Sequence, residues 1–258
     1  MAQNHDTTAL LAPSDVTAAL GLLSRLPITV ETDRTSERGG LAAWAFPLVG
    51  LILALIAGAV TQAALWLGLP SSLAAGLTLA ILIITTGAMH EDGLADSADG
   101  LWGGWDKDHR LKIMKDSFIG TYGMLALALG LVLRWSALTL ILEHGMLWPA
   151  ILACAMLSRA VMVPMMVFLP HARTEGLSHS VGRPPVQTAY VALAIAAAAT
   201  LLLFQLWALW LVATCALTAL ACAAIAKSKI GGQTGDILGA TQQLTDITAL
   251  LTLAALMS

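Results

Sequence analysis

The sequence predicts an all-α membrane protein, a polytopic bundle of about seven membrane-spanning helices preceded by a helix at the membrane interface. The first observation behind this fold class is composition. Of the 258 residues, 58% are hydrophobic and 11% are charged, whereas soluble domains carry roughly 25% charged residues. The mean hydropathy is +0.80. The other two observations are a series of long apolar windows and a one-sided distribution of basic residues.

The apolar windows set the number of expected spans. A helix needs about 20 apolar residues to cross the hydrocarbon core, because it rises about 1.5 Å per residue. Seven windows approach this length: 41–69, 71–89, 122–142, 147–169, 187–204, 206–226 and 240–257. The last is the weakest, since its first turns contain Gln242, Gln243, Thr245 and Asp246. We expect this window to be partly interfacial or to face a polar cavity.

The basic residues fall on one side of the membrane if the seven windows alternate in direction. Those outside the windows are Arg25, Arg34, Arg38, Lys107, Arg110, Lys112, Lys115, Arg173, Arg183, Lys227 and Lys229. Because cytoplasmic loops collect Lys and Arg, the sequence predicts a cytoplasmic N-terminus and a C-terminus on the opposite side. With six spans only the C-terminus would move.

Residues 1–40 form a cytoplasmic N-terminal segment in this interpretation. Its acidic and basic residues include Asp6, Glu31, Asp33, Arg34 and Glu37. No apolar stretch of signal-peptide length occurs there, so no cleavage is expected. Ser14 and Asp15 are expected to cap a short helix that stops at Pro27 and lies on the bilayer surface.

No repeat or linker divides the chain, so residues 1–258 are expected to form a single integral membrane domain. Its longest polar segments, residues 90–121 and 227–239, fall on the cytoplasmic side, where the chemistry is expected. The net charge is −3 and no basic tract occurs, so nucleic acid is not an expected partner. The three cysteines lie in apolar runs without C-x-x-C spacing and are interpreted as packing residues.

The first polar segment begins with a cluster of acids in MHEDGLADSADGLWGG, residues 89–104. On a helix, Asp92, Asp96 and Asp99 would project from one face. Because like charges at this spacing repel, and because oxygen ligands suit Mg²⁺ or Mn²⁺, we interpret them, together with Glu91, as metal ligands. The glycines of the segment, which include Gly93 and Gly100, are expected to let a ligand approach the backbone. A solvated helix end is the alternative interpretation.

Two further polar motifs lie on the same side. RLKIMKDSFIGTYG, residues 110–123, supplies Arg110, Lys115, Asp116, Ser117 and Thr121, which suit a phosphate or diphosphate beside a bound metal. GGQTGDILGA, residues 231–240, supplies Gln233, Thr234 and Asp236. The bias of basic residues toward the cytoplasm would equally explain Arg110 and Lys115.

Charged residues also occur inside the apolar windows. Arg134 and Arg159 lie in the third and fourth windows, where an ionised side chain costs at least about 2.5 kcal/mol. Each is expected either to reach an anionic ligand or to pair structurally. His90 adjoins the acidic cluster and is a candidate ligand or base, with a structural hydrogen-bonded role as the alternative.

In this order, the three polar motifs resemble those of the cobalamin synthases, also called adenosylcobinamide-GDP ribazoletransferases. SRLPI near Arg25 and FPLVG at residues 46–50 are also similar to the N-terminal segments of that family. The resemblance extends over most of the chain. One departure is Glu91, where an apolar residue is expected in many relatives, which makes Glu91 a less secure metal ligand than the three aspartates.

The resemblance implies Mg²⁺-dependent transfer of adenosylcobinamide phosphate from adenosylcobinamide-GDP to α-ribazole or its 5′-phosphate, with release of GMP. It implies that Asp92, Asp96 and Asp99 hold the metal, and that Asp116 or Asp236 orients the attacking hydroxyl. The residues expected at the substrates are His90, Gly93, Gly100, Arg110, Lys115, Ser117, Thr121, Arg159, Gln233 and Thr234. A multi-pass protein of the bacterial inner membrane is implied, as a homo-oligomer or in association with other corrin-pathway enzymes.

Two other functions fit part of the pattern. A CDP-alcohol phosphotransferase also builds carboxylates on membrane helices, but an Arg shortly after D-G and a further D-x-x-x-D pair would be expected, and residues 92–104 contain no Arg. A secondary transporter would explain Arg134 and Arg159. It would need acids near the bilayer midplane, whereas nearly all acids lie at or beyond the end of a window.

Overall fold

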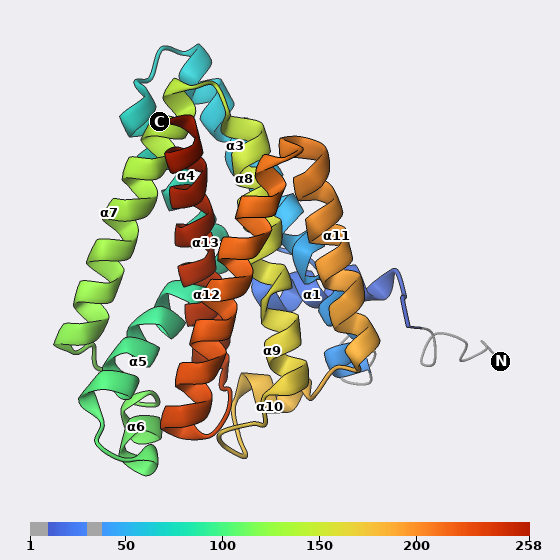
Figure 1. Cartoon of the computed structure of the whole chain (residues 1–258), viewed down its shortest axis with the longest axis vertical. Helices are drawn as coiled ribbons and strands as arrows, with labels where there is room; N and C mark the ends of the chain where they lie inside the picture. Colours follow the sequence, from blue (N-terminus) through green and yellow to red (C-terminus); the bar gives the residue numbers. More distant parts are fainter. Residues whose placement is uncertain (1–9, 30–37) are drawn as a thin grey trace.

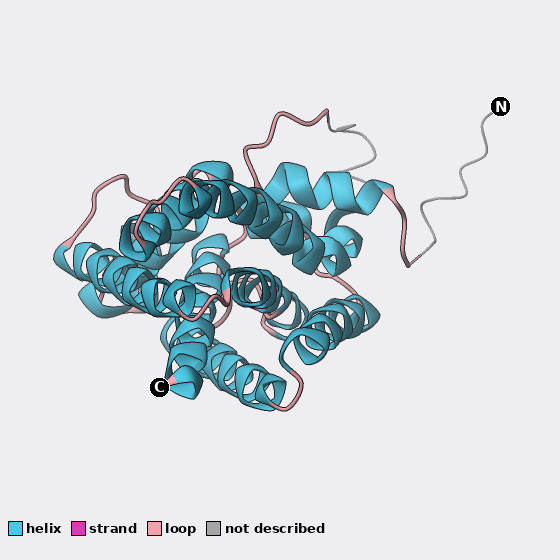
Figure 2. Ribbon diagram, turned by 90° about the horizontal axis from the view of Figure 1, so that it is seen from above, coloured by secondary structure: helices cyan, strands magenta, loops and turns pink. Residues whose placement is uncertain are grey.

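The computed structural model describes residues 10–29 and 38–258, and it confirms the all-α fold class. The helices are α1 (Ser14–Leu23), η1 (Gly39–Ala45), α3 (Phe46–Trp66), α4 (Ser71–Thr86), α5 (Met89–Gly103), α6 (Lys107–Ile113), α7 (Thr121–Glu143), α8 (Leu147–Ala160), α9 (Met162–Phe168), α10 (Leu177–Val181), α11 (Val186–Phe204), α12 (Trp207–Ile230) and α13 (Gly235–Met257). Figure 2 shows helices and loops, with no strand in the described residues.

Five helical segments of the described chain are long and apolar enough to span a membrane: Gly39–Trp66, Thr121–Glu143, Leu147–Phe168, Val186–Phe204 and Trp207–Ile230. They match the first and the third to sixth predicted windows. The predicted number of about seven is therefore higher than the five found, or up to six if a bent helix pair counts as one span. The second and seventh windows account for the difference.

The second window, residues 71–89, is not one straight helix. Helix α4 ends at Thr86, and α5 starts at Met89 after a bend of 88°. The bend occurs at Gly87 and Ala88, which have φ values of 64° and 57°. Since Gly reaches this left-handed region without the strain that a side chain causes, Gly87 is suited to ending α4. The acidic segment thus forms a helix of its own, outside the five segments that qualify as spans.

The seventh window corresponds to α13, which starts at Gly235, before the predicted residue 240. This helix is not among the five candidate spans. It packs against α5, α7, α8, α9 and α12, and its polar residues Gln242, Gln243, Thr245 and Asp246 are buried. The polar turns therefore face the interior of the bundle rather than lipid. This agrees with the second of the two expectations, that the window faces a polar environment inside the protein.

The basic segments that follow the second, fourth and sixth windows lie at one end of the bundle. Helix α6, helix α10 and the end of α12 lie together there, and the C-terminus lies at the opposite end (Figure 1). This arrangement agrees with the alternation predicted from the basic residues, while the orientation in a membrane stays a prediction. Arg34 and the acidic residues Asp6, Glu31, Asp33 and Glu37 lie outside the described residues.

Helix α1 packs on the rest of the protein through a buried carboxylate. Asp15 accepts hydrogen bonds from Arg38 Nε at 2.7 Å, Arg38 Nη2 at 2.6 Å and Trp44 Nε1 at 2.7 Å. These bonds hold the pKa of Asp15 below its usual value, although burial alone would raise it. No side chain caps the helix, which ends at Leu23 rather than at Pro27. Asp15 therefore anchors α1 instead of sharing the expected cap.

Candidate active site

The acidic cluster lies on one helix, as predicted. All three aspartates belong to α5, and their spacing of four and three residues places them along one side of it. Their environments differ: Asp92 is exposed, Asp96 is partly buried and Asp99 is buried. The three carboxylates are therefore not equivalent.

Asp99 binds the start of α7. Its Oδ2 accepts a hydrogen bond from the amide of Gly120 at 2.7 Å, and its Oδ1 accepts one from Gly123 at 2.9 Å. A Cβ atom at either glycine would collide with the carboxylate. Since a negative charge is favoured at a helix N-terminus, Asp99 anchors α7, and its oxygens are already engaged. The prediction that it is a metal ligand is not supported by this geometry.

Asp236 lies beside the acidic helix. Gly93 of α5 faces α13, where an added Cβ would come within 2.8 Å of the carbonyl oxygen of Asp236 and 3.2 Å of Gly239 Cα. This close crossing of α5 and α13 brings Asp92 and Asp236 to the same cavity. The expectation that Gly93 and Gly100 let a ligand approach is corrected, because Gly93 admits α13 and Gly100 packs on Arg110 and Met114 of the α6 segment.

Substitution of Gly93 by alanine is expected to disturb the site. The new Cβ would meet backbone atoms, which cannot move aside as a flexible side chain can. Because a displacement of about 1 Å can lower a rate about 10²-fold, we expect Gly93→Ala to lower turnover by one to two orders of magnitude. Gly76→Ala in α4 is the control, since its Cβ would lie 4.0 Å from Trp135. Equal turnover in both variants would contradict the role of the crossing.

Asp96 has a strongly perturbed carboxyl group. Its pKa is raised to about 7, chiefly by partial burial and in addition by the nearby carboxylates of Asp92, Asp236, Asp116 and Asp99. These acids come from α5, the loop after α6 and the start of α13. Segments far apart in the sequence thus gather negative charge at one place, which is the situation that a cation or a cationic ligand relieves.

This charge makes stability depend on pH in metal-free buffer. Between the usual value of 3.8 and about 7 for Asp96, the folded protein binds more protons than the unfolded chain, so stability is expected to fall as pH rises through this window. The raised pKa of Asp236, caused chiefly by burial, acts in the same direction. With a chelator present, we expect the thermal midpoint to be a few degrees lower at about pH 8 than at about pH 5. If the thermal midpoint of Asp96→Asn depended on pH as strongly as that of the unmodified protein, the assignment of this effect to Asp96 would be contradicted.

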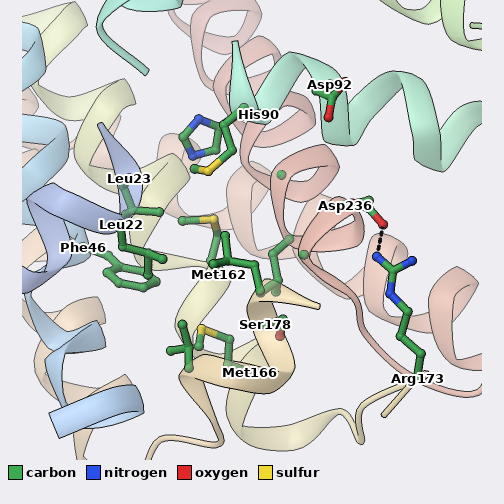
Figure 3. Close-up of a pocket in the computed structure, with 16 residues that line it drawn as sticks. Leu22, Leu23, Phe46, His90, Asp92, Met162, Met166, Arg173, Ser178 and Asp236 are labelled. Carbon is green, nitrogen blue, oxygen red and sulfur yellow. Dashed lines mark hydrogen bonds and ion pairs between the residues drawn. The ribbon is translucent and has the colours of Figure 1, made fainter. Parts of the chain in front are cut away.

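A cavity of about 240 Å³ opens beside Asp92 and Asp236. Helices α1, α3, α5, α9, α10 and α13 contribute to its lining. Figure 3 shows Asp92 and Asp236 on the same side of it, with Arg173 reaching Asp236. The Arg173 Nη2 to Asp236 Oδ2 distance is 2.7 Å. The cavity therefore has a charged edge, whereas most of its remaining lining is apolar.

The motif before α13, residues 231–240, is held by internal hydrogen bonds. Gln233 is buried, and its Oε1 accepts a bond from Ser178 at 2.6 Å while its Nε2 lies 3.0 Å from His171 Nδ1. Thr234 caps α13 through the amide of Ile237 and donates to Asp236 at 3.1 Å. These side chains thus fix the loop before α13 and orient Asp236. Direct contact of Gln233 or Thr234 with substrate stays a prediction.

The basic motif lies at the edge of the site. Arg110 donates to the carbonyl oxygens of Gly104 at 3.0 Å and Lys229 at 2.9 Å, which ties α6 to α5 and α12. Lys115 forms an exposed ion pair with Glu175. Asp116 and Ser117 are exposed, as is Thr121 at the start of α7. Their predicted contacts with phosphate stay predictions, and Arg110 already has backbone partners.

Glu91 belongs to a different cluster inside the bundle. Its Oε1 lies 3.1 Å from Arg134 Nη1, and Arg134 Nε lies 3.1 Å from Asp246 Oδ2. Gln243 donates to the same Glu91 oxygen at 3.0 Å. Buried charges require such partners. Of the two expected roles of Arg134, the structure shows structural pairing, and Glu91 is not placed among the candidate metal ligands on the Asp92 side.

His90 and Arg159 also adjoin this interior cluster. Both line a cavity of about 20 Å³ together with Glu91, Arg134 and Asp246. Arg159 donates to the carbonyl oxygen of Ala155 at 3.1 Å and does not line the larger cavity, so its predicted contact with substrate is not supported. His90 is buried and lines both cavities. Its side chain therefore lies between the charged interior and the candidate active site.

Comparison with known proteins identifies the family. The sequence profile described as cobalamin-5-phosphate synthase matches residues 15–254. The chain belongs to the cobalamin-5-phosphate synthase family. It is 41% identical over 243 residues to the adenosylcobinamide-GDP ribazoletransferase of Bradyrhizobium diazoefficiens, with 94% of each chain covered. It is 44% identical over 252 residues to a protein of the same name from a Sinorhizobium species, covering 93% of this chain and 95% of the relative. No solved structure matches the chain.

Membership of the cobalamin-5-phosphate synthase family agrees with the resemblance found in the three motifs. It also decides against the lipid-enzyme and transporter interpretations. Sequence reasoning missed Arg173, which it counted only as a loop charge, and the apolar side chains around the cavity. No local signal distinguishes these residues from other loop arginines and other leucines or methionines, because their importance comes from the packing of distant segments.

Proposed function

We propose that the protein is an adenosylcobinamide-GDP ribazoletransferase of the bacterial inner membrane. It transfers adenosylcobinamide phosphate from adenosylcobinamide-GDP to a ribose hydroxyl of α-ribazole or its 5′-phosphate, and releases GMP. The observation that carries this proposal is the placement of Asp92 and Asp236 at one edge of a cavity. The two residues come from helices that are far apart in the sequence. The names of the relatives support the choice of substrates. The basic residues at the same end favour a cytoplasmic active site.

Mg²⁺ is the proposed metal, with Mn²⁺ as a substitute. The described residues contain no group of three His, Cys, Asp or Glu side chains arranged to hold a metal. The side chains nevertheless fit Mg²⁺, because this ion is often held by one or two carboxylates and completes its ligands with water and substrate phosphate. Asp92 and Asp96 lie one turn apart, and burial and other carboxylates, with no cation among them, raise the pKa of Asp96. When bound, the ion would neutralise charge on the diphosphate.

The residues of the chain have distinct roles in this proposal. Asp92 and Asp96 would hold the metal and, with it, the diphosphate, so that the phosphorus atom is oriented for attack. The hydroxyl oxygen of the acceptor forms a bond to this phosphorus, the bond to the GMP oxygen breaks, and Asp236 takes the hydroxyl proton. The raised pKa of Asp236, due chiefly to burial, makes it a better proton acceptor than an ordinary aspartate. Arg173 fixes the orientation of the Asp236 carboxylate.

Lys115 is the proposed cation for phosphate oxygens at the edge of the site. Its ion pair with Glu175 is exposed, and such surface pairs contribute little to stability. The ammonium group can therefore exchange Glu175 for a phosphate at little cost. Arg110, whose donors engage two backbone carbonyls, holds α6 in place. Asp116 stays a proposed alternative for orienting the acceptor hydroxyl.

The test is a transfer assay with purified protein in liposomes. Adenosylcobinamide-GDP and α-ribazole phosphate are supplied with Mg²⁺ or with a chelator, and GMP and the corrinoid product are measured together. We expect equal amounts of both products, formed only with the metal. Absence of product from folded protein would overturn the proposed reaction. Product formation that is insensitive to chelation would leave the reaction standing but remove the metal from it.

A further inference from the structure

The cavity beside Asp92 and Asp236 has an apolar side. Side chains from three helices form this side: Leu22 and Leu23 of α1, Phe46 of α3, and Met162 and Met166 of α9. Figure 3 shows them grouped together, across the cavity from Asp92 and Asp236. The cavity is therefore amphipathic, with hydrogen-bonding and charged groups concentrated at one edge.

We infer that this cavity is the binding site for the nucleoside acceptor, with the aromatic base against the apolar side and the ribose at the Asp92–Asp236 edge. The inference rests on the proposed function, because that function requires an acceptor hydroxyl beside the carboxylates. It adds the position of the acceptor and the residues that select its base: Leu22, Phe46, Met162 and Met166.

The size of the cavity favours the acceptor base over the corrin. An engineered apolar cavity of about 150 Å³ binds benzene, so about 240 Å³ is suited to a bicyclic ring system. Sites that enclose drug-sized ligands occupy about 300–1,000 Å³. The corrin ring with its side chains is larger than such ligands and cannot enter this cavity. It must therefore remain outside, with only its phosphate reaching the carboxylates.

The chemistry of the lining distinguishes the acceptor base from guanine. Guanine presents donors and acceptors around its edge, and burying them without partners is unfavourable. The apolar side of the cavity offers Leu22, Leu23 and Phe46, which form no side-chain hydrogen bonds. A base with a hydrocarbon edge loses nothing there, and it gains contacts with the Phe46 ring and with the methionine sulfur atoms, which pack well on aromatic rings.

The polar groups of the lining determine where the ribose of the acceptor binds. Asp92, Arg173, Ser178 and Asp236 all line the cavity, and the Arg173 guanidinium lies 2.7 Å from Asp236. A hydroxyl group placed at this edge meets the carboxylate that we propose as proton acceptor. The same placement turns the base toward α1 and α9. One orientation of the nucleoside therefore satisfies both sides of the cavity.

The test fills the apolar side with a larger side chain. Leu22 is partly buried on α1, so Leu22→Trp extends into the cavity without replacing a fully buried residue. Thr17→Trp, on the exposed side of the same helix, is the matched control. We expect Leu22→Trp to raise the KM for α-ribazole phosphate about tenfold or more, while the KM for adenosylcobinamide-GDP changes less than twofold. For an acceptor whose base is a single imidazole ring, the increase in KM caused by Leu22→Trp should be smaller. Thr17→Trp should change neither KM.

Equilibrium dialysis with radiolabelled α-ribazole phosphate, without the donor, separates this inference from the proposed reaction. Weaker binding to Leu22→Trp than to Thr17→Trp and the unmodified protein would support the cavity, even if no product forms and the reaction fails. Unchanged acceptor KM and unchanged binding in Leu22→Trp would overturn the cavity assignment, even if transfer proceeds. Equal increases in both KM values would also overturn it. Thermal midpoints of both variants confirm that they fold.

Discussion

Asp92→Asn removes most of the transfer activity in the proposed mechanism. The exposed carboxylate of Asp92 faces the same cavity as Asp236, and in the proposed mechanism its charge would help to hold the metal and the diphosphate. Removing one group that stabilises a transition-state charge lowers the rate of an enzyme by about 10²–10³-fold. We expect a loss at least this large, measured as GMP released per protein in liposomes at saturating Mg²⁺. Folding should be unaffected, because an exposed side chain changes by one atom.

Asp108→Asn is the matched control for this variant. Asp108 is an exposed acid of α6 in the same polar segment, and it loses the same charge without facing the cavity. Its turnover is expected to stay within twofold of the unmodified protein. If Asp92→Asn retained full turnover, or if both variants lost activity equally, the acidic helix would not hold the substrate in the way we propose.

Arg134→Met is expected to have the largest effect on stability. Arg134 is buried and pairs with Glu91 and Asp246, each at 3.1 Å, so its removal leaves two carboxylates unpaired in the bundle. Breaking a buried ion pair from one side costs about 3–5 kcal/mol. For a chain of this size this corresponds to a decrease of about 10 °C in the thermal midpoint. The midpoint in detergent measures it, and Arg183→Met at an exposed position is the control.

Unpaired charge and lost packing could both destabilise Arg134→Met, and two further substitutions separate these causes. Adding Glu91→Gln and Asp246→Asn to Arg134→Met removes the two unpaired charges, so part of the lost stability is expected to return. A midpoint for Arg134→Met equal to that of the unmodified protein would show that the cluster is not a stabilising contact. Because Glu91 neighbours Asp92 on α5, we also expect the cluster to fix the rotation of the acidic helix.

The sequence was sufficient for the features that depend on local pattern. Five of the seven apolar windows correspond to candidate spans, and the i, i+4, i+7 spacing correctly placed Asp92, Asp96 and Asp99 along one side of a helix. The motif order led to the family. These predictions succeeded because helix formation and side-chain direction repeat along the chain and need no knowledge of what packs against it.

The sequence was insufficient where the answer depends on packing between distant segments. Hydropathy could not show that Asp236 lies beside α5, that Asp99 binds the start of α7, or that Gly93 faces a helix rather than a ligand. It also missed the bend at Gly87, because Ala88 next to it is an ordinary helix-forming residue. Glu91 and Asp92 are adjacent, yet a helix turns by about 100° per residue, which separates their surroundings.

The central claim is that carboxylates of α5 and α13 form one site, and cysteine cross-linking in native membranes tests it most directly. Asp92→Cys and Asp236→Cys are introduced together after Cys154, Cys215 and Cys222 are replaced by alanine. A short bifunctional thiol reagent is predicted to join the two cysteines within one chain, whereas an Asp92→Cys and Glu143→Cys pair, with Glu143 at the C-terminal end of α7, is not. Absence of the first cross-link in reagent-accessible protein would contradict the site.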